Sequence, residues 1–226
     1  MNTELGKKIL GALVAADWQA LDGERRAMLV RTAEITLHRF DLLPGKDTAA
    51  LLAKLDPLFP ASTPELNWLL CETLVYLRSP TVAAKTMALI AAAPTQEEQI
   101  EYARSLRMLA TGWTTATRNA YFEWFLKAAN FRGGASFSKF IEFIRNDAVA
   151  TLTPEERTTF AAVLDKKSTR RSAIENFGDV FAGRTFKNWT LDELASAAER
   201  GMKGRNFDNG RKMFGAAACF ACHRFG

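Results

Sequence analysis

Two cysteines and a histidine near the end of the chain have the spacing of a covalent haem attachment site. Cys219, Cys222 and His223 form a Cys-x-x-Cys-His pattern in a chain of 226 residues that has three cysteines and two histidines. On a helical turn, cysteines three positions apart project to one side and can form thioethers with the two vinyl groups of one haem. The histidine that follows then directs its imidazole at the iron as an axial ligand. The pattern therefore predicts a haem c, with His223 as the metal ligand.

Other chemistry is open to the same three residues. A zinc site needs four ligands, and only Cys219, Cys222 and His223 are within reach of one another. A thioredoxin-like redox pair needs a strand–helix–strand setting, and no strand pattern surrounds the motif. An incidental cysteine pair would leave His223 unexplained. Haem attachment is the preferred interpretation, and a metal site or an incidental pair is the alternative.

The remaining candidate residues point to structure rather than chemistry. Cys71 lies in an apolar helical stretch and is expected to be a small core residue. His38 lies near a predicted helix end, where a capping or partly exposed histidine is the ordinary interpretation. The sequence offers no paired carboxylates that can be placed in a pocket and no dinucleotide-binding pattern, so it assigns no catalytic residue.

The positive charge of the chain is concentrated in its last quarter. Residues 1–165 hold 18 Lys and Arg against 19 Asp and Glu, a balance of −1, whereas residues 166–226 hold 12 against 6, a balance of +6. This basic region is either a solvated linker or a positive rim that steers an acidic redox partner. Aromatic side chains lie among these charges, but no nucleic-acid motif accompanies them, so we expect no nucleic-acid partner.

No segment has the composition of a membrane span or a clear export signal. No stretch of about 18 apolar residues lacks a charge, which excludes a transmembrane helix in this sequence. Lys7 and Lys8 precede an apolar run from Ile9 to Ala16, but the run is short and its apolar residues have helical spacing. We expect a packed amphipathic helix there. Haem attachment to this motif occurs outside the cytoplasm, so the motif predicts an extracytoplasmic location, periplasmic or membrane-associated.

The pattern is helical nearly throughout, and no window alternates convincingly with a period of two. Thr-x-x-Glu capping boxes begin at Thr95, Thr153 and Thr190, and Ser79-Pro80 is a further predicted helix start. We therefore expect at least 60% helix and no sheet of three or more strands. The predicted helices are 3–20, 23–40, 46–56, 63–77, 80–92, 95–111, 114–130, 136–151, 154–165, 190–200 and 207–221.

These short helices predict an all-α fold of stacked antiparallel pairs, either a HEAT-like helical repeat or an irregular α-solenoid. The pair 63–77 and 80–92, closed by a tight turn, resembles one HEAT-type unit. Lys and Arg clusters and two glycines interrupt the pattern at 166–189, which predicts an irregular, exposed linker. The predicted domains are thus a scaffold at 1–165, the linker at 166–189, and an incomplete c-type cytochrome domain at 190–226.

The helix before the motif resembles the first helix of class I cytochromes c. Gly210 and Phe214 lie four residues apart on one helical face and precede Cys219. In those cytochromes the corresponding glycine and aromatic residue pack against the carboxyl-terminal helix.

Most of residues 50–226 also resembles the carboxyl-terminal part of membrane-bound dehydrogenases with a haem-binding domain. The segments that carry this resemblance are Leu55-Asp56-Pro57-Leu58-Phe59-Pro60, Ala93-Pro94-Thr95-Gln96-Glu97-Glu98-Gln99-Ile100, Tyr121-Phe122-Glu123-Trp124-Phe125, Phe131-Arg132-Gly133-Gly134, Gly204-Arg205-Asn206-Phe207-Asp208-Asn209-Gly210-Arg211 and Cys219-Phe220-Ala221-Cys222-His223-Arg224-Phe225. In that family a β-propeller is followed by a HEAT-like region and a cytochrome c module. The resemblance implies that Cys219 and Cys222 hold haem and that His223 ligates its iron.

The chain departs from that pattern at its end. It stops three residues after His223, whereas a cytochrome c takes a distal ligand and a covering helix from further downstream. Met202 and Met213 lie upstream on or before the same helix and cannot readily reach the opposite haem face. We therefore expect the sequence to be an excerpt of a longer protein.

Two functions follow from these observations. The first is electron transfer through a covalently bound haem, within a larger dehydrogenase-like protein that contacts a redox partner protein or an attached dehydrogenase domain. The second is a non-enzymatic helical-repeat scaffold for protein interactions, in which the Cys-x-x-Cys-His motif is vestigial or binds a metal. Any dehydrogenase activity would belong to a domain implied by the resemblance.

Overall fold

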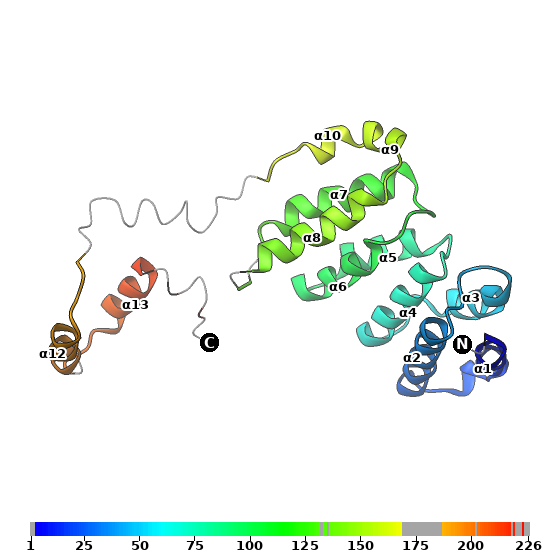
Figure 1. Cartoon of the computed structure of the whole chain (residues 1–226), viewed down its shortest axis with the longest axis horizontal. Coiled ribbons are helices and arrows are strands. Elements are labelled where there is room, and N and C mark those ends of the chain that lie inside the picture. The colour runs from blue at the N-terminus through cyan, green and yellow to red at the C-terminus, as the bar shows by residue number, and fades with distance from the viewer. Residues whose placement is uncertain are drawn as a thin grey trace. The chain divides into compact units, whose positions relative to one another are not determined.

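The computed structural model describes residues 3–131, 133–134, 136–168, 187–201, 203–217, 219 and 223. Of these residues, 72% are helical and none lies in a strand (Figure 1). The all-α fold, the helix content above 60% and the absence of a sheet are therefore confirmed for the described part of the chain. Among the same residues, no helix combines the length and the apolar character needed to cross a membrane.

The chain divides into two compact units. The first comprises Met1–Phe131 and Lys139–Lys167, and the second comprises Arg132–Ser138 and Ser168–Gly226. The division near residue 167 falls within the predicted linker 166–189. Residues 166–168 and 187–190 have no regular secondary structure, and 169–186 lie outside the described residues.

Short helices joined by short connections make up the first unit. They are α1 (Thr3–Ala15), η1 (Trp18–Ala20), α2 (Gly23–Arg39), η2 (Lys46–Thr48), α3 (Ala49–Leu55), η3 (Asp56–Leu58), α4 (Pro64–Tyr76), α5 (Val82–Ala92), α6 (Gln96–Leu106), α7 (Thr115–Ala128), α8 (Phe137–Ala150), α9 (Pro154–Thr159) and α10 (Ala161–Leu164). The second unit contains the first two residues of α8, then α12 (Leu191–Gly201) and α13 (Phe207–Ala216).

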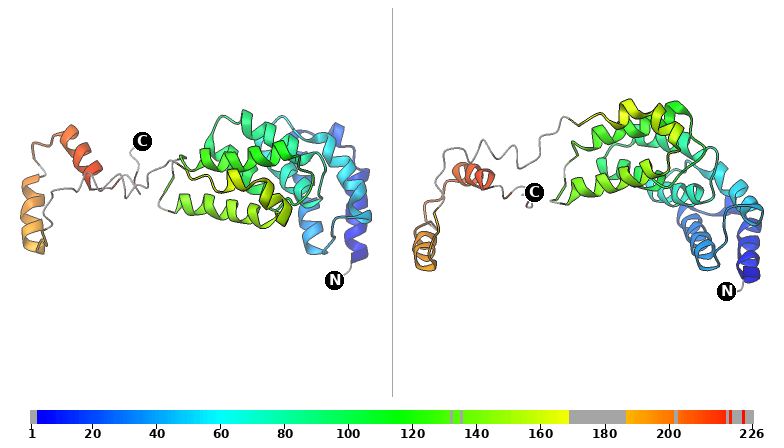
Figure 2. Two further views of the ribbon diagram at one scale, coloured as in Figure 1. Left: turned by 90° about the horizontal axis from the view of Figure 1, so that it is seen from above. Right: turned by 45° about the horizontal axis from the view of Figure 1, so that its top comes forward.

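In the first unit, α1, α4 and α5 each pack against both the next α-helix and the one after it. α4 contacts α2, α5 and α6, and α5 contacts α6 and α7 (Figures 1 and 2). This stacking follows from helices that are apolar on more than one face, because a helix with a single apolar stripe needs one partner layer and these need two.

The core of the first unit is built from buried aliphatic and aromatic side chains along the whole stack. Trp18 is 1% exposed, and its indole Nε1 donates to the carbonyl oxygen of Leu13 at 2.8 Å. Farther along, the ring centroid of Tyr121 lies 5.1 Å from that of Phe125, and the Trp124 centroid lies 5.0 Å from Phe125. Such edge-on aromatic packing adds to the stabilisation from buried area.

Threonine side chains begin the helices at the positions that the capping patterns predict. Thr153 and Glu156 bond to each other's backbone N–H at the start of α9 (3.2 and 3.0 Å), which completes a capping box. At α6, Thr95 accepts the N–H of Glu98 at 3.2 Å. These caps satisfy backbone donors that a helix leaves unpaired in its first turn.

The helix predicted from Ser79-Pro80 is present, but α5 begins two residues later than predicted, with Thr81 as its N-cap residue. The Ser79 oxygen accepts the N–H of Thr81 at 3.2 Å, and its hydroxyl has a partner outside the helix. It donates to Oδ1 of Asp56 at 2.5 Å, and the Thr81 hydroxyl donates to the same oxygen at 2.7 Å. Lys85 Nζ lies 3.0 Å from Oδ2. The Asp56 carboxylate therefore accepts hydrogen bonds from both hydroxyls. α5 begins two residues later than a helix capped by Ser79 would.

Polar side chains also join one helix to the next but one. Thr73 Oγ1 on α4 donates to Glu34 Oε1 on α2 at 3.0 Å, and Arg104 on α6 lies 3.8 Å from Glu72 on α4. Burial raises the pKa of Glu34, although the hydrogen bonds from Thr73 and Arg31 oppose that rise. Each contact fixes the register of two stacked helices.

Candidate functional site

The helix that leads to the haem motif has a defined beginning and end. The Asn206 side chain accepts the backbone N–H of Asn209 at 2.8 Å, which caps α13. At the other end the N–H of Ala217 donates to the carbonyl oxygen of Met213 at 2.8 Å. The predicted helix 207–221 is therefore shorter than expected, and α13 ends before Cys219.

A separate backbone bond brings two of the three predicted site residues into one turn. The N–H of His223 donates to the carbonyl oxygen of Cys219 at 2.8 Å, which is the spacing of one α-helical turn. Cys219 is a free, half-buried cysteine, with its Sγ 3.9 Å from the carbonyl oxygen of Ala217, and His223 is exposed. Cys222 lies outside the described residues.

The available donors fit a haem. Cys219 has no disulfide partner among the described residues, so its thiol is available for a thioether, and the imidazole of His223 is exposed one turn later. Haem would be held by thioethers at Cys219 and Cys222 and by the imidazole of His223. Apolar side chains stand on the preceding helix, where Phe207 is 82% and Met213 48% exposed.

The third cysteine cannot take the place of either motif cysteine. Cys71 is fully buried in α4, and its Sγ lies 3.3 Å from Oγ1 of Thr86. Burial raises the pKa of Cys71 to about 12, although hydrogen bonds from Thr86 and Ser105 oppose this rise. The thiol is therefore protonated at neutral pH and inaccessible, as the prediction of a core residue requires.

No other metal site competes with the motif in the part of the chain that the structure describes. Among those residues, no group of three or more His, Cys, Asp or Glu side chains could hold a metal ion. His38 is exposed in the last turn of α2. It belongs to the first unit, whereas His223 belongs to the second. The position of His38 agrees with its predicted place near a helix end.

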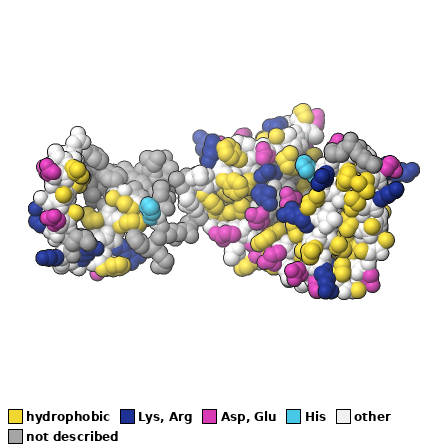
Figure 3. All heavy atoms as spheres, turned by 60° about the horizontal axis from the view of Figure 1, so that its bottom comes forward, with side chains coloured by type: hydrophobic (Ala, Val, Ile, Leu, Met, Phe, Trp, Pro, Cys, Tyr) yellow, Lys and Arg dark blue, Asp and Glu magenta, His cyan; other side chains and the backbone are white. Residues whose placement is uncertain are grey.

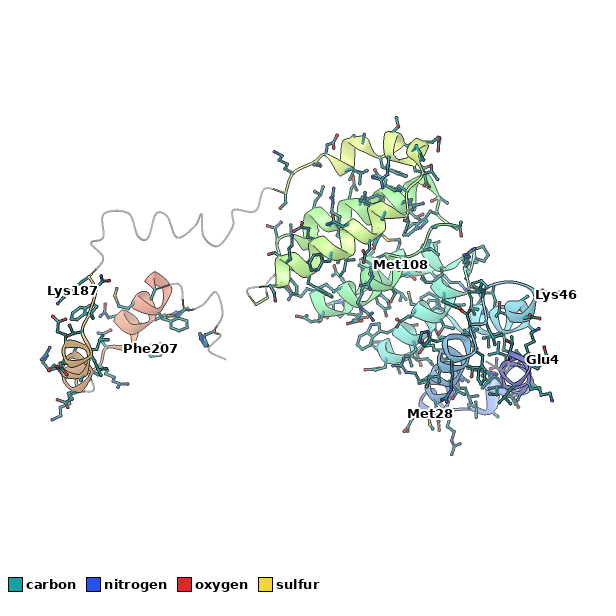
Figure 4. The ribbon with its side chains drawn as sticks, in the orientation of Figure 1. Glu4, Met28, Lys46, Met108, Lys187 and Phe207 are labelled. Atoms are coloured by element: carbon teal, nitrogen blue, oxygen red, sulfur yellow. The ribbon has the colours of Figure 1, made fainter. Side chains whose placement is uncertain are left out.

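The second unit has a further cluster, which the sequence patterns did not single out, at the start of α12. Lys187 is labelled in Figure 4. Its Nζ lies 4.1 Å from the ring centroid of Trp189 and 2.7 Å from Oε1 of Glu193. Glu193 and Thr190 complete the predicted capping box, with bonds of 3.0 and 3.3 Å. The hydrogen bond from Lys187 and the backbone bond at Thr190 lower the pKa of Glu193.

Apolar side chains of this unit stand exposed rather than buried (Figure 3). Leu191 is 81%, Leu194 50% and Trp189 53% exposed, and no residue of α12 is buried. An amphipathic pattern with a tryptophan at its start is the sequence signal that could have identified this surface.

One expectation from the resemblance concerns Gly210, which should allow close helix contact. In the structure a Cβ on Gly210 would have no heavy atom within 4 Å. The glycine is therefore not required by any contact among the described residues.

Comparisons with known proteins found no match: no protein-family model, no curated protein and no solved structure matches the chain.

Proposed function

We propose that this protein is an α-helical scaffold that carries a c-type haem at Cys219, Cys222 and His223 and transfers electrons through it. The observation that carries the proposal is the Cys-x-x-Cys-His spacing. The 2.8 Å backbone bond between His223 and Cys219 supports it, because it sets the two residues one helical turn apart. The free thiol of Cys219 and the exposed imidazole of His223 add chemical support.

Attachment requires both cysteines in the reduced state. Each thiol adds across one vinyl group: a sulfur–carbon bond forms, the vinyl double bond becomes single, and the thiol hydrogen goes to the other vinyl carbon. No electron is gained or lost, so the reaction needs no oxidant. Among the described residues Cys219 has no disulfide partner, which is compatible with this requirement.

When bound, the haem supplies one-electron chemistry at its iron. His223 would give one ring nitrogen to the iron, which requires the neutral imidazole. The apolar side chains of α13, among them Phe207 and Met213, would limit water at the haem and so influence its reduction potential.

The stacked helices of the first unit support a HEAT-like scaffold that presents the haem module to a partner. By the resemblance, that partner is a dehydrogenase domain of the same larger protein or a separate redox protein. Haem attachment by this motif further implies an extracytoplasmic location.

The direct test is covalent haem on the full chain, exported to the periplasm of a bacterium that has haem-ligation machinery. A haem-stained denaturing gel should show haem on the unmutated protein and on the control Cys71→Ala. It should show none on Cys219→Ala/Cys222→Ala. His223→Ala should keep covalent haem at least in part but lose the histidine–iron bond, seen as a changed visible spectrum.

Two results would contradict the proposal. The unmutated protein recovered from the periplasm could lack covalent haem. Alternatively, it could bind stoichiometric zinc through the same cysteines. Either result would favour a scaffold whose motif is vestigial or binds a metal.

A further inference from the structure

The outer face of α2 carries two large apolar side chains that the helix stack does not bury. Met28 is 64% and Ile35 55% exposed, whereas Val30 and Ala33 on the opposite side of the helix are completely buried. Figure 4 shows Met28 at the outer edge of the first unit, away from α1 and α4, which α2 contacts. α2 therefore has an apolar stripe besides the one that its own fold uses.

Two charged residues extend this stripe toward the ends of the helix. Glu24 lies in the first turn of α2 and Arg39 in the last, and both are exposed. At about 100° per residue, Glu24, Met28, Ile35 and Arg39 fall within an arc of about 60° on the helix surface. Among the residues that the structure describes, neither Glu24 nor Arg39 has an ion-pair partner. The stripe is thus acidic at one end, apolar in the middle and basic at the other end.

The order of these four residues is self-complementary. The point midway between Met28 and Ile35 is also the point midway between Glu24 and Arg39. If two copies of α2 lie antiparallel about that point, Met28 of each copy meets Ile35 of the other. Glu24 of each copy then meets Arg39 of the other. A two-fold dimer needs a surface of this kind, because every contact between the copies must occur twice.

The centre of the stripe also fits this arrangement. Arg31 lies beside the midpoint, and its Nη1 is 2.7 Å from Oε2 of Glu34. In the antiparallel pair the two Arg31 side chains approach each other near the two-fold axis. The carboxylate of Glu34 accompanies each guanidinium, so the like charges are compensated where they come close.

We propose that this face of α2, formed by Glu24, Met28, Ile35 and Arg39, is the interface through which two copies of the chain associate. A second copy fits better than an unrelated protein, because the same four residues supply both halves of every contact. The contact is small beside the roughly 1,200–2,000 Å² that stable complexes bury, so the association should be weak and reversible. The inference goes beyond the proposed function and does not depend on the haem motif.

The test is the mass of the full chain by sedimentation equilibrium at increasing concentration. A thiol reductant is included, so that Cys219 and Cys222 cannot cross-link copies. The mass should rise from one chain toward two. Ile35→Arg should weaken the association by about tenfold or more, because it sets a charge in the apolar centre of the contact. The matched control is Phe143→Arg on α8, since Phe143 is also 55% exposed and should not affect the mass.

Charge reversal tests the antiparallel arrangement itself. Glu24→Arg and Arg39→Glu should each weaken the association, because each sets like charges opposite one another twice. Glu24→Arg/Arg39→Glu should restore it to within about threefold of the unmutated protein. The two positions are about 22 Å apart along one helix, so this restoration requires a contact between copies.

Three outcomes would overturn the inference. The chain could remain a single copy at every concentration, which would leave the stripe to a different partner. Phe143→Arg with unchanged circular dichroism could weaken the association as much as Ile35→Arg, which would move the interface to another face. The protein with both charges reversed could stay as weak as the single variants, which would exclude the antiparallel pairing. None of these outcomes alters the haem-stained gel, so the proposed function is tested separately.

Discussion

Both units contain amphipathic helices, but their apolar side chains are mostly buried in the first unit and exposed in the second. In the first unit, α4 buries residues on several sides against α2, α5 and α6, and Leu70 and Leu74 are completely buried. In the second unit, α12 has a complete capping box and an apolar stripe, yet no residue of it is buried. Caps and amphipathic patterns therefore specify a helix, whereas burial needs a partner surface.

The largest difference between the units should come from truncating a leucine in each. Leu70→Ala should lower the free energy of unfolding by about 3 kcal/mol, because it leaves a cavity among packed helices. Leu191→Ala, at an 81% exposed position, should change it by less than about 0.5 kcal/mol. Urea unfolding followed by circular dichroism measures both. Equal losses would mean that α12 is packed against something in solution.

Ion pairs provide the next comparison. Arg118 is buried in α7, where it contacts Glu156 at 2.7 Å and Thr151 at 2.7 Å and donates to the carbonyl oxygen of Ala110 at 3.3 Å. Burial lowers the pKa of Arg118, although Glu156 opposes this. Arg118→Ala should cost about 3 kcal/mol, since it strips the partners of a buried charge.

The exposed pair of Lys187 and Glu193 is the matched case in the second unit. Lys187→Ala should cost less than about 1 kcal/mol, and any loss should vanish in 1 M salt, because exposed charges are screened. The loss in Arg118→Ala should persist at that salt concentration. A loss of stability in Lys187→Ala that does not change with salt would contradict the expectation that this pair is screened.

A smaller effect should appear as pH dependence at Asp56. Burial, the largest single influence, raises the pKa of Asp56, but hydrogen bonds from Ser79, Thr81 and Lys85 together outweigh it and leave the pKa below its ordinary value. A carboxyl whose folded pKa is depressed stabilises the fold above its unfolded pKa of about 4, and that contribution is lost as pH falls through the folded pKa.

Asp56→Asn should therefore be less stable than the unmutated protein at pH 7, by about 1–2 kcal/mol, and the gap should narrow below about pH 4. Urea midpoints measured from pH 7 to pH 2.5 give the result. Glu193→Gln is the control, since that exposed carboxylate should leave the unfolding of the first unit unchanged. A gap that stays constant with pH would show that the Asp56 contacts are not electrostatic.

Glycine substitutions should give the smallest effects and differ in sign. A Cβ on Gly6 in α1 would lie 2.7 Å from Cβ of Phe40, so Gly6→Ala should destabilise the first unit by about 1 kcal/mol. Gly11 in α1 and Gly210 in α13 have open space around them. Gly11→Ala should raise the melting temperature slightly, and Gly210→Ala should raise helix content, because alanine favours the helix by about 1 kcal/mol. A destabilising Gly210→Ala would reveal a helix packed on α13.

Most helix positions could be predicted from the sequence because their signals are local. A threonine cap or an apolar period lies within one or two turns of the helix that it specifies, as at Thr95, Thr153 and Thr190. The differences came where another side chain, distant or local, changes the start or end of a helix. Ser79 was predicted to begin a helix, but its hydroxyl bonds to Asp56, 23 residues earlier. The helix predicted at 3–20 is longer than α1, because the Asp17 side chain caps a separate short helix, η1.

The candidate site follows the same division. The sequence by itself predicts the chemistry proposed for the motif, since the types and spacing of Cys219, Cys222 and His223 need no tertiary information. It also determined that Cys71 is a core residue. Only the tertiary structure decided which apolar helices are covered and which polar groups meet, as for Arg118 and Glu156, 38 residues apart. The physical reason is that capping and periodicity act between neighbours in the chain, whereas burial and buried ion pairs depend on surfaces that only folding brings together.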